Sequence, residues 1–202
     1  MRSGEPLLTE ITTRAELRSW LDVHADTAKA CWVAVSMKPE TGKLFYLDVV
    51  EECLCFGWID STKQKVSDEP GAGAAQRLSP RSRRSSWTEL NKERIRRLER
   101  LGLMRDEGRN VLPDPLLHPF KIDEAIETRL NEDPLVYRNF LAFPELYRRI
   151  RIDTIQSCRR EPARYAARLD KFIAYTRENR IYGQWDDGGR LSERLPAESE
   201  AQ

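Results

Sequence analysis

The extended, β-rich runs of this chain all lie in its first 81 residues, and helical periodicity dominates the remainder. The longest run is Cys31–Met37, whose apolar residues alternate so that they share one face. Three shorter extended segments follow at 44–46, 58–60 and 77–79. Strands early and helices late are typical of an α+β fold. We therefore predict a small mixed sheet with packed helices, followed by a helical C-terminal subdomain.

Local signals place three helices in the first half of the chain. Thr13 and Glu16 have the spacing of a capping box at the start of a first helix. Asp48 begins a second helix, which Gly57 closes in the left-handed conformation. A third helix is predicted over 86–101, begun by a capping box at Ser86 and Glu89.

The chain has 202 residues, which is long enough for one domain with an appended subdomain. Three prolines within seven residues mark a break after the third helix. The predicted organisation is an α+β core over 12–109, a Pro-rich linker over 110–120, a helical subdomain over 121–182 and a disordered tail over 186–202.

Composition excludes several classes of protein. No apolar run approaches the ~18 residues that span a bilayer, and the first residues lack the apolar stretch of a secretion signal. The four cysteines lie in apolar or helical patterns, so we expect buried thiols in a cytoplasmic protein. Neither a zinc spacing nor a glycine-rich phosphate loop is present, and we expect no metal and no cofactor.

The net charge is only +1, but basic residues are concentrated in two blocks. Residues 77–109 and 137–180 each contain 11 Lys or Arg against 5 Asp or Glu. Such blocks favour an anionic ligand or a nucleic acid, whereas interleaved acids are more typical of a solvated helix face. We favour the solvated face.

The most informative segment is 56–91, together with the helix that ends it. On a helical wheel Asn91 and Arg94 fall inside the apolar arc of that helix. A buried Arg needs an anion or acceptors, and a buried Asn needs partners for both ends of its amide. The pattern indicates either a satisfied structural network or the floor of a polar pocket.

Asp60 is the one candidate catalytic residue in this segment. Its neighbours in sequence include several cations, which lower the pKa of a carboxyl and favour ion pairing over proton transfer. Structural pairing with Arg77 or Arg81 is the simpler interpretation. The candidate ligand-binding residues are Trp58, Asp60, Lys63, Arg77, Arg81, Ser85, Trp87 and Asn91.

Four stretches in this region together resemble the YdeI/OmpD-associated family, also called bacteriocin-protection proteins. They are Phe56–Asp60, Arg77–Arg81, Ser85–Asn91, and Gly102–Met104 with Gly108. The resemblance covers roughly residues 14–109, and 150–172 resembles the family's helical tail more loosely. It implies an α+β core and a role in stress or toxin tolerance, and it supplies no catalytic mechanism.

Three functions remain open. The leading one is a cytoplasmic tolerance protein that binds a small anionic or aromatic ligand between Trp58, Trp87, Arg77 and Arg81. The alternative is an enzyme that modifies a small toxic metabolite, with Asp60 as base. The second alternative, which we favour less, is a nucleic-acid binder that uses basic helices. No membrane partner is expected, and the sequence does not indicate an oligomeric state.

Overall fold

The computed structural model describes residues 4–66, 73–82, 85–112 and 119–192. The chain divides into two compact units. The first comprises residues 1–87 and 94–116, and the second comprises residues 88–93 and 117–202. Most of the predicted linker, including residues 113–118, lies outside the described residues.

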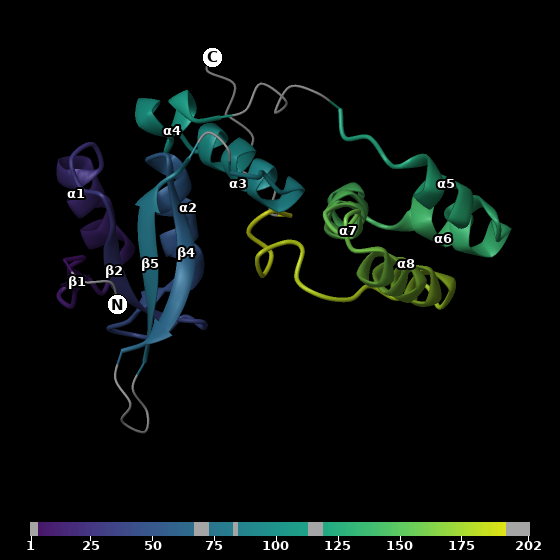
Figure 1. Ribbon diagram of the computed structural model, residues 1–202, viewed down its shortest axis with the longest axis horizontal. Coiled ribbons are helices and arrows are strands. Elements are labelled where there is room, and N and C mark those ends of the chain that lie inside the picture. Colours follow the sequence, from purple (N-terminus) through teal and green to yellow (C-terminus); the bar gives the residue numbers. More distant parts are fainter. Residues whose placement is uncertain (1–3, 67–72, 83–84, 113–118, 193–202) are drawn as a thin grey trace, which may run out of the picture. The chain divides into compact units, whose positions relative to one another are not determined.

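The first unit is built on a five-stranded mixed sheet, which confirms the predicted α+β fold. The central strand β2 (Cys31–Ser36) pairs antiparallel with β5 (Ala74–Pro80), and β5 pairs antiparallel with β4 (Trp58–Lys65). Two short strands, β1 (Leu7–Leu8) and β3 (Leu44–Phe45), pair in parallel with the other edge of β2. Figure 1 shows β4 and β5 side by side, with helix α2 (Tyr46–Cys55) next to β4.

Helices α1 (Arg14–His24) and α2 (Tyr46–Cys55) begin and end largely as the local signals predict. Both hydrogen bonds of the capping box between Thr13 and Glu16 are present. Helix α2 starts two residues earlier than predicted, and Gly57 follows it with a φ of 69°. That left-handed conformation is strained for residues with a side chain.

Apolar side chains of α1, α2 and one face of the sheet form the core of the first unit. Leu17, Leu21, Val33, Trp58 and Leu78 are all buried in it. The cysteines Cys31, Cys53, Cys55 and Cys158 are free and buried, as predicted. Burial raises the pKa of the Cys31 and Cys55 thiols to about 12, so these thiols stay protonated at neutral pH.

The predicted third helix is observed as α3 (Glu89–Arg100), which starts three residues later than expected. The Thr88 hydroxyl, rather than that of Ser86, accepts the main-chain N–H of Asn91 at 3.2 Å. Residues 88–93 belong to the second unit and the remainder of the helix to the first. Within the first unit, the short helix α4 (Asp106–Asn110) packs against α2.

The second unit is helical. It contains α5 (Glu124–Asn131), α6 (Pro134–Ala142), α7 (Glu145–Gln156) and α8 (Pro162–Arg177), with Pro134 and Pro162 in the first turns of their helices. Figure 1 shows α6 beside α8.

The core of the second unit is closed by residues that follow α8. Tyr147 of α7 and Phe172 of α8 are fully buried in it, and Trp185 packs its ring against Tyr147. Residues 186–192 of the predicted disordered tail form turns in which Leu191 is buried. Residues 193–202 lie outside the described part of the chain. Among the described residues, no helix combines the length and the apolar composition that a membrane-spanning helix requires.

Candidate functional site

Asp60 is bonded to a residue that the sequence did not single out, Tyr46. The Tyr46 hydroxyl, at the first position of α2, donates to Oδ2 of Asp60 on β4 at 2.6 Å. Burial raises the pKa of Tyr46, and the hydrogen bond to Asp60 raises it further. A phenol that donates to a carboxylate stabilises the charged carboxylate. This bond occupies one of the two oxygens of the Asp60 carboxylate.

Arg81 is a buried cation with few partners. Arg81 directly follows the last residue of β5, and only 6% of Arg81 is exposed. The guanidinium lies 3.9 Å from the centroid of the Trp87 ring, and Nη1 donates to the Ser86 carbonyl at 3.1 Å. Within the described residues, its buried Nε has no hydrogen-bond partner.

The electrostatics of Arg81 follow from this burial. Desolvation lowers the pKa of Arg81, while the nearby charge of Asp60 opposes that change. In the described part of the chain, however, no carboxylate reaches ion-pair distance of the Arg81 guanidinium. Burying an ion without a directly paired counter-ion is costly, so this position is suited to accepting an anion.

Arg94 of α3 is buried, as its position on the apolar arc predicts. Its positive charge partly offsets the rise in the pKa of Tyr46, which places its charge close to that hydroxyl. We define the Arg81 cluster as Tyr46, Asp60, Arg81, Trp87 and Arg94. All five residues belong to the first unit.

Arg77 does not join this cluster, so the predicted pairing of Asp60 with Arg77 is wrong. Asp60 lies opposite Leu78 in the sheet. Because side chains alternate along a strand, Arg77 projects from the other face. There it forms an ion pair with Glu5 at 2.7 Å, and Glu5 also accepts from the indole N–H of Trp32.

Trp58 is 1% exposed and cannot line an open pocket. Its indole N–H donates to the Ala25 carbonyl at 3.2 Å, and its ring meets Trp20 edge-on. It is therefore a core residue, contrary to its predicted role as a pocket wall.

The remaining predicted site residues are Lys63, Ser85 and Asn91. Lys63 is exposed on β4, beyond a register shift in the strand. The main-chain N–H of Ser85 donates to the Ser82 carbonyl at 2.9 Å. Asn91 belongs to the second unit, so its place in the ligand-binding site stays a prediction.

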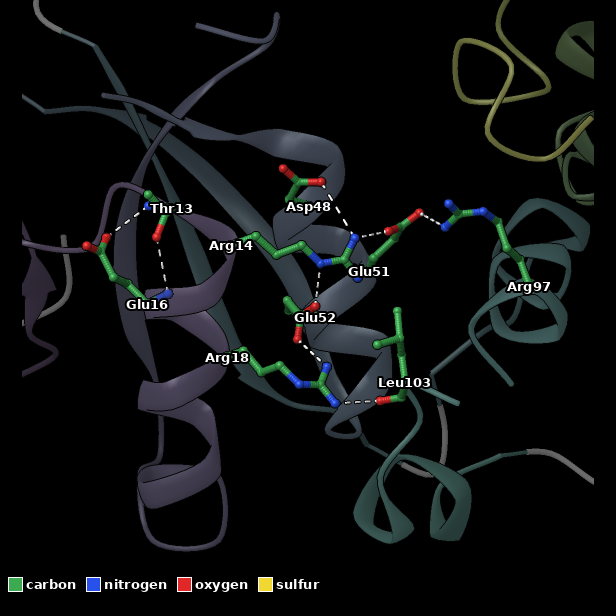
Figure 2. A network of polar contacts seen from close by, with 9 residues as sticks. All are labelled: Thr13, Arg14, Glu16, Arg18, Asp48, Glu51, Glu52, Arg97 and Leu103. Carbon is green, nitrogen blue, oxygen red and sulfur yellow. Dashed lines mark hydrogen bonds and ion pairs between the residues drawn. The ribbon is translucent and has the colours of Figure 1, made fainter. Parts of the chain in front are cut away.

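Sequence reasoning also missed a buried network of charges in the first unit, drawn in Figure 2. Glu52 of α2, fully buried, accepts from Nε of Arg14 at 2.6 Å and from Nη1 of Arg18 at 2.8 Å. Its neighbour Glu51 accepts from Nη1 of Arg14 at 2.5 Å and from Nη1 of Arg97 at 2.9 Å. The available signal was a pair of glutamates within the apolar sequence of α2.

This network ties α1, α2 and the first-unit half of α3 together. Arg18 also donates to the Leu103 carbonyl at 2.7 Å. Because both carboxylates are taken up by arginines, we interpret the network as structural. In the described part of the chain, no three His, Cys, Asp or Glu side chains are grouped as metal ligands would be. A cavity of ≈ 150 Å³ is lined by other residues, among them Leu21, Phe56 and Arg105.

Two family models match the chain, one in each half. A family described as a domain of unknown function (DUF8412) matches residues 9–111. A family described as Bacteriocin-protection, YdeI or OmpD-Associated matches residues 119–179. No curated protein and no solved structure matches the chain.

The resemblance to the YdeI/OmpD-associated family is therefore confirmed, but over a different part of the chain. The match covers α5 to α8, where the motif resemblance was looser. The quoted motifs between 56 and 108 lie within the segment that the other family matches. The match over 119–179 suggests a bacteriocin-protection-like function.

Proposed function

Since the chain belongs to the family of the domain of unknown function DUF8412, we propose that it is a bacteriocin-protection-like protein whose first unit binds a small anionic ligand at the Arg81 cluster. The tolerance role rests on the family match over 119–179. The ligand site rests on one observation, the burial of Arg81 with a free Nε and no directly paired carboxylate within the described residues.

The state of Arg81 supports an anion as the ligand. A guanidinium presents five donors in a fixed fork, and among the described residues the guanidinium of Arg81 donates to one acceptor, the Ser86 carbonyl. Its lowered pKa reflects a desolvation penalty that a bound carboxylate or phosphate would offset. Polar groups that are left unsatisfied in the folded state are typical of sites selected for binding rather than for stability.

Trp87 supports a planar ligand. Its half-buried ring stacks on the Arg81 guanidinium, so the pair offers an aromatic surface next to a cation. Small-molecule sites commonly combine aromatic walls with a few fixed polar groups. An aromatic carboxylate meets both requirements.

The competing enzyme function has less support. A general base must have an acceptor oxygen available to the substrate, and one of the two oxygens of Asp60, Oδ2, already accepts a hydrogen bond from the Tyr46 hydroxyl. We propose that Asp60 instead limits the site to a single anionic group, because a second anion beside it would be repelled. The free, buried cysteines support the expected cytoplasmic location, since thiols remain reduced there.

A survival assay tests the proposed function. Bacteria sensitive to a bacteriocin would express the wild type, Arg81→Met or Arg100→Met, with an empty vector for reference. Arg100 is an exposed arginine at the end of α3 and serves as the matched control. We expect the wild type and Arg100→Met to raise survival, and Arg81→Met to return survival to the empty-vector level at equal protein abundance. Failure of the wild type to protect would contradict the proposal.

A further inference from the structure

Three cations of the second unit gather around one tyrosine, Tyr182. The guanidinium of Arg151 on α7 lies 5.4 Å from the centroid of the Tyr182 ring. The ammonium of Lys171 on α8 lies 4.9 Å from the same centroid. Burial raises the pKa of Tyr182, and the positive charges of Arg151 and Arg168 partly offset that rise, which places both charges near the hydroxyl.

These three cations differ from other basic residues of the same unit. Arg129, Arg159 and Arg177 each pair with a carboxylate of the second unit. In contrast, the described residues place no carboxylate within ion-pair distance of Arg151, Arg168 or Lys171. Arg168 donates to the Thr154 carbonyl and Arg151 to the Gln184 carbonyl. Neutral carbonyls leave the positive charges uncompensated.

The chain is shaped to hold Arg151 in this position. Gly183 has a φ of 70°, and a Cβ added there would lie 2.8 Å from Nη1 of Arg151. The guanidinium therefore packs directly against the backbone that carries Tyr182. The buried Nε of Arg151 has no hydrogen-bond partner among the described residues. An arginine fixed in this way is oriented before any ligand arrives.

We propose that Arg151, Arg168, Lys171 and Tyr182 form a second anion site, which binds a phosphoryl group. A phosphate monoester has a charge of about −1.5 to −2 and three acceptor oxygens at neutral pH. Two guanidinium forks, one ammonium and a phenol that stays protonated supply donors to match. This site shares no residue with the Arg81 cluster, so each can fail without the other.

Isothermal titration calorimetry on the full chain tests the site. The titrants are inorganic phosphate, AMP, and vesicles of phosphatidylglycerol with phosphatidylcholine vesicles as reference. Lys171→Gln removes an exposed cation of the site, and its fold is checked by thermal melting. Arg164→Gln is the matched control, because Arg164 lies on the same helix and pairs with Glu161. We expect binding about tenfold weaker for Lys171→Gln, the usual effect of losing one charge-assisted hydrogen bond. We expect no change for Arg164→Gln.

The titrants also separate the sources of the phosphoryl group. Comparable binding of phosphate and AMP supports a free phosphate, and tighter binding of AMP supports a nucleotide. Binding of phosphatidylglycerol vesicles alone supports a lipid headgroup. The proposal is overturned if none of the three binds at millimolar concentration, or if both variants weaken binding equally. Binding of duplex DNA with a low-micromolar Kd in physiological salt would also overturn the proposal if the Lys171→Gln variant bound DNA with the same Kd. The basic residues would then act as a general polyanion surface.

Discussion

Replacing Glu52 by glutamine is expected to lower the free energy of unfolding by about 3–5 kcal/mol, the usual effect of removing one partner from a buried ion pair. Glu52 is fully buried, and it is the acceptor for both Arg14 and Arg18. The amide has no negative charge, so the half-buried guanidinium of Arg18 would lose its carboxylate partner, and Arg14 would keep only its pairing with Glu51 and Asp48. Chemical denaturation followed by tryptophan fluorescence measures the change.

The control for this variant is Glu99→Gln. Glu99, like Glu52, accepts two hydrogen bonds, but both come from Arg109. The side chains of Glu99 and Arg109 are largely exposed. Exposed ion pairs contribute about 0–1 kcal/mol, so we expect a change of that size. Equal changes for Glu52→Gln and Glu99→Gln would show that the network in Figure 2 does not stabilise the first unit.

Gly108→Ala is expected to destabilise the first unit by about 3 kcal/mol, at the upper end of the usual range for overpacking. A Cβ at Gly108 of α4 would lie 2.2 Å from the Cys55 carbonyl oxygen and 2.8 Å from that of Leu54. These are backbone atoms at the end of α2, so α4 would have to move away from α2. The loss would appear as a lower denaturation midpoint.

Gly73→Ala is the matched control for this second variant. Among the described residues, no atom lies within 4 Å of a Cβ at Gly73, and surface substitutions of this kind change stability by about 0.5 kcal/mol or less. If Gly108→Ala were as stable as Gly73→Ala, the close approach of α4 to α2 would be incorrect.

Elements whose signals are local could be predicted from the sequence. The capping box of Thr13 and Glu16 starts α1, and Gly57 ends α2, because each depends on neighbouring residues alone. The start of α3 was misplaced because both Ser86 and Thr88 are suitable caps. The observed start also uses a distant partner, since the Asp153 carboxylate accepts the N–H of Glu89 at 3.0 Å. Such a contact leaves no trace in a local window.

The site was predicted in part, and the missing information was strand register. Asp60 and Arg81 were both singled out from their sequence neighbours, and their charges do interact in the first unit. The sequence could not show that Asp60 of β4 lies opposite Leu78 of β5 in the sheet. Because of this register, Arg77 projects from the opposite face. Tyr46 was missed because its hydroxyl meets Asp60 only after α2 packs on β4.

Thermal melts of the wild type and Arg81→Met, with and without benzoate, test the ligand site at Arg81 most directly. Replacing a buried, unpaired cation by an apolar side chain of similar length is often neutral for stability. Without ligand, the free energies of unfolding of the two proteins should therefore differ by less than about 1 kcal/mol. Benzoate should then raise the Tm of the wild type alone. At a benzoate concentration of about a hundred times Kd, the free energy of unfolding of the wild type should increase by about 2.7 kcal/mol. An unstable Arg81→Met protein, together with no benzoate shift in the wild type, would contradict the site and assign Arg81 to the structure alone.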